Sequence, residues 1–533
     1  MTKVTARALS APEVRARIVA RNEIEAAIID VRPGGTFGDA HLLWANSVPL
    51  STLELIILDR VPRLDTPVIL CSMDEDDVHL VAAAAERMAA IGYTDLSYLK
   101  GGVAAWEAAG FEVFSGVNVP SKAFGEFVEH AYDTPRIPAP DLKKMMDEGA
   151  DFVVLDSRPM SEFSAMNIPM GVDVPGGELA LRVYDIAPSP KTTVVVNCAG
   201  RTRSIIGCQS LRNAGILNPV VALENGTMGW HLAGFELEYG NTRRYGELTD
   251  IGLAIALEAA ARVRKRFGVP VINAETLQKW TADTARTTYV LDVRDPEEYA
   301  AAHIPGSRPA PGGQLVQATD KYVGTLGSRV VCVDDNGVRA IMTASWLIQI
   351  GWEAVVLEPG AVRMSEAGYH IAPVPPVPHV PMIEPVALAA RMIQTNVVDV
   401  GDSLSHRKGH IPGSRFAFRA NMPENLRDLP TGRPLALTSS DGVLAAFACA
   451  DLIAAGISDV MAVKGGTAAW KAAGLPLMDG FENNLDQSVD VWYRPYDMDD
   501  AQEGAMKQYL SWEVNLVQQI ERDGTTNFKV YPE

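Results

Sequence analysis

The chain has 533 residues, more than one hydrophobic core ordinarily organises, which favours three or four domains. Its hydrophobic content of 47% and charged content of 21% are typical of folded protein and exclude a disordered chain. The 66 acidic against 47 basic residues give a formal net charge of −19, which argues against nucleic acid or an anionic membrane as the main partner. Any anion site would therefore have to be a local basic pocket.

The N-terminal residues, MTKVTARALSAPEVRARIVARNEIEAA, lack the continuous apolar core of a signal peptide, and no later run has the length of a membrane span. These features predict a cytoplasmic protein without a membrane partner. The five cysteines are scattered, with no CxxC pair and no Cys/His cluster at zinc spacing: Cys71, Cys198, Cys208, Cys332 and Cys449. We therefore expect no disulfide scaffold, no metal and no cofactor, so a functional cysteine would act as a thiol.

Four short apolar segments, each with an aspartate near its end, recur along the chain: IIDVR (28–32), VLDSR (154–158), VLDVR (290–294) and VVDVG (397–401). A turn landmark follows each of them and reads HIPGS at 303–307 and 410–414, NIPMG at 167–171, and HLLWA at 41–45. The spacing is that of a domain and is longer than the repeat of a solenoid. The sequence therefore predicts four copies of one domain-sized unit.

The rest of each copy keeps a fixed order. A second apolar strand comes next (TPVIL, TTVVV, SRVVC or RPLAL), followed by a loop and an Ala-rich helix. A third strand, a glycine turn and another helix close the copy, as in YLKGGVAAWEAAGF and AVKGGTAAWKAAGL. Short buried strands that alternate with helices indicate an α/β fold, in which each copy forms a small parallel sheet with helices on both faces.

These landmarks resemble rhodanese (thiosulfate sulfurtransferase) domains, four in tandem. The Asp-x-Arg strand, the HIPG turn, the cysteine position after the second strand and the GG-x-x-x-W turn all belong to that family's pattern. The predicted domain bounds are 1–117, 118–247, 248–377 and 378–482, followed by a helical tail over 483–533. For the tail, packing against a neighbouring domain is favoured over a role as a partner-binding helix.

The loop after the second strand differs among the copies. Aligned on the glycine that ends the following helix, it begins at Cys198 in the second copy (CAGRTRS), at Asp334 in the third (DDNGVRA) and at Ser439 in the fourth (SSDGVLA). In the first copy Cys71 falls at this position or one residue before it, and the acidic loop SMDEDDVHL would raise a thiol pKa and repel an anionic donor. Domain 2 is therefore the predicted catalytic domain, and domains 1, 3 and 4 are predicted to be inactive.

Cys198 is the predicted nucleophile. A loop between a parallel strand and the N-terminus of the next helix is where open α/β sheets bind ligands, and its N–H groups and the helix dipole attract anions. This setting lowers a cysteine pKa, so we expect a thiolate at neutral pH without a dedicated general base. The residues predicted to bind the substrate are Ala199, Gly200, Arg201, Thr202, Arg203 and Ser204.

The charged residues near the loop allow two interpretations. Arg201 and Arg203 would hold an anionic donor. A solvated surface position is nearly as well supported for Arg201, and a structural role for Arg203 stays open because Arg339 occupies the same place in the third copy. Asp156 and Arg158 are predicted to brace the loop as a structural pair, since the aspartate also appears in copies without the thiol.

The resemblance implies a double displacement. Cys198 would take the outer sulfur of thiosulfate or a similar small anionic donor as a persulfide and pass it to cyanide or a thiol acceptor. The six-residue loop from Cys198 to Arg203 resembles the sulfurtransferases, whereas phosphatase-like relatives have seven residues there. The alternative is a sulfur-relay or scaffold protein that delivers persulfide to a protein acceptor, with thiosulfate turnover incidental.

Overall fold

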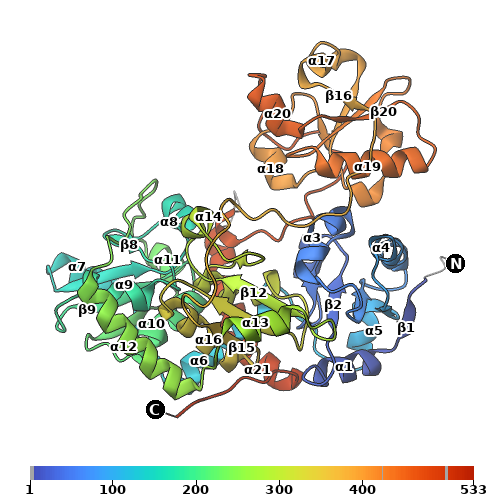
Figure 1. The fold of residues 1–533 in the computed structure, drawn as a ribbon. Helices are drawn as coiled ribbons and strands as arrows, with labels where there is room; N and C mark the ends of the chain where they lie inside the picture. The colour runs from blue at the N-terminus through green and yellow to red at the C-terminus, as the bar shows by residue number, and fades with distance from the viewer. Residues whose placement is uncertain (1–4, 423, 498–501, 533) are drawn as a thin grey trace. The chain divides into compact units, whose positions relative to one another are not determined.

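The computed structural model describes residues 5–422, 424–497 and 502–532. Each of the four sequence copies forms one α/β domain, which we number 1 to 4 in chain order (Figure 1). Domain 1 comprises β1 (Arg7–Leu9), α1 (Ala11–Val19), β2 (Ala27–Asp30), α2 (Gly34–Asp39), β3 (Asn46–Ser47), α3 (Leu53–Arg60), β4 (Val68–Cys71), α4 (Val78–Ile91), β5 (Leu96–Leu99) and α5 (Gly102–Ala108). The helix α6 (Val119–Tyr132) follows it.

Domain 2 repeats this order of elements. Domain 3 repeats it up to the last strand, but the closing helix expected from the sequence is not formed, since residues 358–381 contain no helix. Domain 2 comprises β6 (Arg136–Ile137), α7 (Ala139–Asp147), β7 (Phe152–Asp156), α8 (Met160–Ala165), β8 (Gly171–Asp173), α9 (Leu179–Ile186), β9 (Thr193–Asn197), α10 (Thr202–Ala214), β10 (Val220–Leu223) and α11 (Gly226–Leu232). After α12 (Asp250–Phe267), domain 3 comprises β11 (Val271–Ile272), α13 (Ala274–Thr281), β12 (Thr288–Asp292), α14 (Pro296–Ala301), β13 (Arg308–Pro309), α15 (Gly312–Gln317), β14 (Arg329–Val333), α16 (Val338–Ile350) and β15 (Glu353–Leu357).

Domain 4 and the tail complete the chain. Domain 4 comprises β16 (Met382–Ile383), α17 (Pro385–Ala389), β17 (Asn396–Asp399), α18 (Ser403–Lys408), β18 (Arg415–Phe416), β19 (Leu435–Thr438), α19 (Val443–Ala454), β20 (Val460–Val463) and α20 (Gly466–Ala472). The tail carries the long helix α21 (Gln502–Asp523). Within the described part of the chain, no helix is both long and apolar enough to cross a membrane.

Four parallel five-stranded sheets with one common strand order confirm the predicted α/β fold. The orders are β1-β5-β4-β2-β3, β6-β10-β9-β7-β8, β11-β15-β14-β12-β13 and β16-β20-β19-β17-β18. In every sheet the Asp-ending strand lies next to the strand that precedes the loop, as β7 lies next to β9. The end of the aspartate strand and the start of the loop therefore meet at one edge of the sheet.

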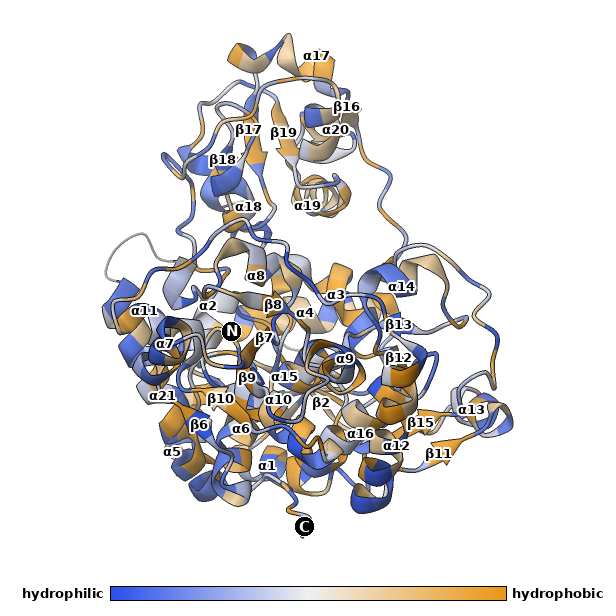
Figure 2. Ribbon diagram, turned by 90° about the vertical axis from the view of Figure 1, so that its left-hand side faces the viewer, coloured by the Kyte–Doolittle hydropathy of each residue, from blue (hydrophilic) through white to orange (hydrophobic). Residues whose placement is uncertain are grey.

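Helices cover both faces of each sheet, as domain 4 illustrates. On one face of β17, Val398 packs with buried residues of α19. On the opposite face its neighbour Val397 packs with Leu388 of α17 and Trp470 of α20. Successive strand residues point to opposite faces, so a strand buried on both sides needs an apolar run. The strands β17 and β19 are correspondingly hydrophobic along most of their length (Figure 2).

The domains associate in two compact units that do not follow chain order. One unit holds Ile28–Val117 and Ala372–Tyr493, which pairs domain 1 with domain 4. The other holds Asn118–Ile371 together with the tail from Arg494, which pairs domain 2 with domain 3, and it also includes the segment Arg15–Ala27 of domain 1. We call them the 1/4 unit and the 2/3 unit.

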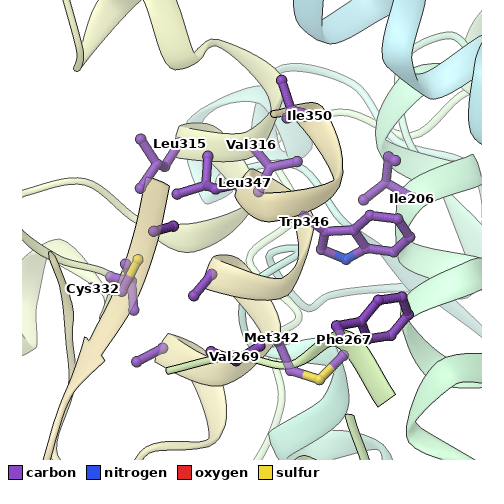
Figure 3. Packing of buried hydrophobic residues seen from close by; sticks show 14 of the residues in the cluster. Ile206, Phe267, Val269, Leu315, Val316, Cys332, Met342, Trp346, Leu347 and Ile350 are labelled. Atoms are coloured by element: carbon purple, nitrogen blue, oxygen red, sulfur yellow. The ribbon is translucent and has the colours of Figure 1, made fainter. Parts of the chain in front are cut away.

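A shared hydrophobic core joins domains 2 and 3. Trp346 and Met342 of α16 lie beside Ile206 of α10 and Phe267 of α12 (Figure 3). The indole Nε1 of Trp346 donates a hydrogen bond of 2.8 Å to Ser210 Oγ, so its one polar atom is satisfied inside the interface. The 2/3 unit is therefore one folded body, and the helix that follows the Cys198 loop is part of its central packing.

Candidate active site

Backbone hydrogen bonds identify the equivalent loop position in all four domains. The residue after each recurring aspartate donates its N–H to the carbonyl of the last residue of the neighbouring strand: Val31 to Cys71, Ser157 to Asn197, Val293 to Val333 and Val400 to Thr438. The next residues along the chain, Ser72, Cys198, Asp334 and Ser439, therefore occupy one structural position. Of these four, only Cys198 carries a thiol.

The other cysteines lie away from this position. Cys71 ends strand β4, one residue before Ser72, so the less favourable of its two sequence registers is the one observed. Burial raises the pKa of the Cys71 thiol well above its ordinary value. Cys208 and Cys449 lie in helices, with pKa values raised by burial to about 12 and about 11, and Cys332 lies within β14. All five cysteines are free.

A buried polar network fixes the position of Cys198. Asp156 accepts hydrogen bonds from Arg158 Nε and Nη2, both 2.8 Å long, and a third of 2.9 Å from Asn197 Nδ2. The same Asn197 amide donates to Thr227 Oγ1 at 3.0 Å, and Thr227 in turn donates its N–H to the Cys198 carbonyl at 2.8 Å. The Asp-Arg strand motif thereby ties the end of β9 to the first turn of α11.

The Cys198 side chain is enclosed. It is 2% exposed, and its Sγ donates to Ser204 Oγ over 3.5 Å. Burial raises the pKa of the Cys198 thiol, while the positive charge of Arg203 and the hydrogen bonds between Cys198 and Ser204 oppose that rise. The lowered pKa expected from the loop is therefore not found in this enclosed state, because loss of hydration is the larger effect.

Arg201 points away from the sulfur and into a buried ion pair. Its Nε and Nη2 donate to the two carboxylate oxygens of Glu126 on α6 at 2.6 and 2.7 Å. Nη2 also lies 2.5 Å from Glu129, and Nη1 donates to Asn225 at 3.2 Å. The guanidinium is 6% exposed, so the solvated surface position considered for it from the sequence is wrong.

Arg203 and Arg339 make reciprocal contacts across the interface between domains 2 and 3. Arg203 pairs with Glu162 of its own domain at 2.9 and 2.7 Å and reaches Gln314 of domain 3 at 3.2 Å. Arg339 pairs with Glu298 of its own domain at 2.6 Å and reaches Glu178 of domain 2 at 2.6 Å. The Arg203 charge still acts on Cys198, so this arginine serves the interface and the thiol together.

The remaining predicted loop residues form the backbone around the sulfur. Ala199 accepts a hydrogen bond from the Met228 N–H, and Thr202 begins α10. Gly200 is tightly enclosed, because a Cβ there would lie 2.8 Å from Met228 Cε, 3.2 Å from Glu513 Oε2 and 3.4 Å from Tyr509 Cε1. A side chain at this position would therefore require Met228 to shift and would press against Glu513 and Tyr509.

The tail helix α21 supplies residues that the sequence interpretation missed. Tyr509 and Glu513 lie against the loop, and Lys122 of α6 lies over the rings of Tyr509 and Trp512 at 4.8 and 4.7 Å from their centroids. One signal was available in the sequence. The buried residues of α21 follow helical spacing, and Glu513 is an acid within an otherwise mainly apolar stripe: Met506, Leu510, Glu513, Leu516 and Ile520.

The loops of domains 3 and 4 hold oxygen atoms where domain 2 holds sulfur. In domain 3, Asp334 accepts hydrogen bonds from the N–H groups of Gly337 at 2.7 Å and Ala340 at 3.2 Å. In domain 4, Ser439 Oγ accepts one from Ala445 N–H at 3.2 Å. The loop backbone of domain 3 thus receives a carboxylate, as expected for an anion-binding concavity at a helix N-terminus.

The structure is that of a tandem-domain protein. Each of its four α/β domains has a parallel sheet, and only domain 2 has a cysteine at the loop position between strand and helix. The rhodanese-like domain profile matches residues 10–109, 138–233, 273–367 and 384–473. The chain therefore belongs to the rhodanese-like domain family.

Two relatives extend this result. A solved structure of a thiosulfate sulfurtransferase from Pseudomonas aeruginosa is 46% identical, covers 99% of this chain and 100% of its own, and superposes with a TM-score of 0.95. The thiosulfate sulfurtransferase GlpE of Pseudoalteromonas translucida is 31% identical over 77 residues, which are 14% of this chain and 73% of that protein. The first likeness extends over all four domains, whereas the second has the length of one domain.

Proposed function

We propose that this protein is a thiosulfate sulfurtransferase whose single working site is the Cys198 loop of domain 2. The observation that carries the proposal is which residue each domain has at the equivalent loop position. The four equivalent loop positions hold Ser72, Cys198, Asp334 and Ser439, so one domain alone has a sulfur nucleophile there. The overall likeness to the Pseudomonas aeruginosa enzyme supports the donor assignment.

The proposed reaction is a double displacement at sulfur. The Cys198 thiolate attacks the outer sulfur of thiosulfate, the S–S bond of the donor breaks, and sulfite leaves with the bonding electron pair. Cyanide or a thiol then attacks the outer sulfur of the persulfide, which releases thiocyanate or a new persulfide and restores the thiolate. The N-terminal end of α10 and the Arg203 charge would stabilise the negative charge on both sulfur species.

The direct test uses Cys198→Ser. We expect thiocyanate formation from thiosulfate and cyanide to fall to background, and intact mass after thiosulfate treatment to show one added sulfur on the wild type and none on the variant. Cys208→Ser is the matched control, because Cys208 is equally buried but lies within α10. Full activity of Cys198→Ser would contradict the assignment.

The alternative role, delivery of persulfide to a protein acceptor, requires that a second protein reach Cys198. Cys198 is 2% exposed, and α21 and Met228 of α11 lie against Gly200 in its loop, so an acceptor protein would need the cover of the loop to move. Small donors and acceptors are favoured for the closed arrangement. A partner that is captured by the persulfide form and not by Cys198→Ser would favour the relay role.

A further inference from the structure

Glu513 places a carboxylate against the proposed sulfur-transfer loop from outside the rhodanese-like domains. The residue lies on α21, is 2% exposed, and its Oε1 accepts hydrogen bonds from Thr202 at 3.3 Å and Tyr509 at 3.0 Å. Its Oε2 is buried and has no hydrogen-bond partner among the described residues. That oxygen lies 3.2 Å from where a Cβ on Gly200 would be, two residues beyond Cys198.

The charged and titratable groups facing this carboxylate come from three elements. Lys122 and Glu126 lie on α6, Arg201 lies in the loop, and Tyr509 lies on α21 itself. Lys122 attracts the Glu513 charge and opposes the rise in pKa that burial imposes on the Glu513 carboxyl. Lys122 is itself buried, and its pKa is lowered to about 8. Lys122 and Glu513 therefore form a pair of opposite charges, and they do not form a pocket of free positive charge.

A negative charge at this place affects both reactants of the sulfur-transfer step. The Glu513 charge acts on Cys198 and opposes formation of its thiolate. It also lies at the N-terminal end of α10, where the helix dipole and Arg203 would otherwise attract an anionic donor. Each additional negative charge on a donor is therefore repelled by Glu513 within a poorly hydrated site.

We propose that Glu513 determines the charge selectivity of the donor site, disfavouring a dianionic donor such as thiosulfate relative to a monoanionic donor of similar size. This inference rests on the proposed function of Cys198. Methanethiosulfonate is the matched probe, because one methyl group replaces one anionic oxygen. Cys198 attacks its outer sulfur in the same way, the S–S bond breaks, and methanesulfinate leaves with the electron pair.

The experiment compares kcat/KM for the two donors with cyanide as acceptor in wild type and Glu513→Gln. We expect the ratio of thiosulfate to methanethiosulfonate kcat/KM to rise about tenfold in the variant, because loss of the Glu513 charge relieves repulsion on one more unit charge in thiosulfate than in methanethiosulfonate. If the substitution only loosened α21, kcat/KM would change by the same factor for both donors, and the ratio would stay the same. Glu513→Ala, which removes the charge without an amide, should give the same direction of change.

Glu503→Gln is the control, because Glu503 is an exposed acid on the same helix and lies 3.9 Å from Lys507. Its donor ratio should equal that of the wild type. An unchanged or lowered ratio in both Glu513 variants would overturn the proposed selectivity. Intact mass separates the two failures: no added sulfur on the wild type from either donor overturns the proposed function, whereas normal addition with an unchanged ratio overturns only the role of Glu513.

Discussion

At the scale of single residues, the neighbouring side chains determine which groups the charge of an arginine interacts with. Arg201 stands three residues after Cys198, yet its guanidinium is held by Glu126 and Glu129 of α6 and is 6% exposed. A buried arginine with two carboxylate partners has few donors left for a substrate. Arg203 has Glu162 as partner but keeps its charge close enough to act on the thiol. The two arginines therefore have different contacts, although their positions in the sequence suggest the same role.

We predict that Arg201→Gln weakens the packing of α6 on α10 rather than donor binding. Loss of the guanidinium leaves Glu126 buried without its partner, which we expect to lower the local opening free energy by about 3 kcal/mol. Native-state hydrogen exchange of α6 and α10 measures this change. Arg136→Gln is the control, because Arg136 is half exposed and faces Glu129 at 3.4 Å. A tenfold rise in donor KM with unchanged exchange would instead assign Arg201 to the donor.

At the scale of elements, α21 packs against the loop that follows Cys198. Met506 and Leu510 of α21 pack with Met228, while Tyr509 and Glu513 of the same helix lie on Gly200. The periodic apolar stripe indicates a packed helix, but any apolar face of suitable width could receive it. Which face does so depends on the shapes that α6, α10 and α11 form together, and these exist only after folding.

Weakening this contact should expose Cys198 to alkylation. In Leu510→Ala, the loss of a buried side chain is expected to cost about 2 to 3 kcal/mol, so α21 detaches more often. The rate of Cys198 carbamidomethylation by iodoacetamide, followed by intact mass, should rise at least tenfold. Val514→Ala is the control, because Val514 is 44% exposed on the same helix. Equal alkylation rates in Leu510→Ala and wild type would show that α21 does not limit access.

At the scale of the whole molecule, a domain whose loop lacks a thiol contributes to the structure of the domain that carries Cys198. Domain 3 has Asp334 in place of the cysteine but keeps Arg339, whose side chain is 1% exposed and joins Glu298 to Glu178 of domain 2. The 1/4 unit uses a comparable link, since Arg419 of domain 4 pairs with Glu54 of domain 1 at 2.7 and 2.9 Å. In each unit, a buried arginine of one domain is thus bound by a glutamate of the other.

We predict that Arg339→Gln destabilises the 2/3 unit without changing how much sulfur it can carry. Glu178 would stay buried without its cation, so thermal unfolding of this unit should begin several degrees lower, and hydrogen exchange in α9 and α16 should increase. Arg286→Gln is the control, because its pair with Glu353 is partly exposed and worth less than about 1 kcal/mol. The mass after thiosulfate treatment should still show one added sulfur. Unaltered exchange in α9 and α16 would contradict the structural role.

The sequence by itself determined the features that depend on local pattern and repetition. The Asp-ending strands, the helices between them and the loop at Cys198 were predictable, because strand and helix periodicity are properties of short segments and four copies could be compared. The register of Cys71 was not predictable, since the longer loop of domain 1 allowed two alignments that only the hydrogen bond from Val31 distinguishes.

The tertiary structure alone decided which segments meet. It paired domain 1 with domain 4 and domain 2 with domain 3, turned Arg201 toward α6, and laid Glu513 of the tail on the loop more than three hundred residues earlier in the chain. The raised pKa of Cys198 also depends on the tertiary structure, because burial of the thiol outweighs the charge of Arg203 and the hydrogen bonds with Ser204. Such contacts depend on how complete surfaces fit together, which no short stretch of sequence encodes.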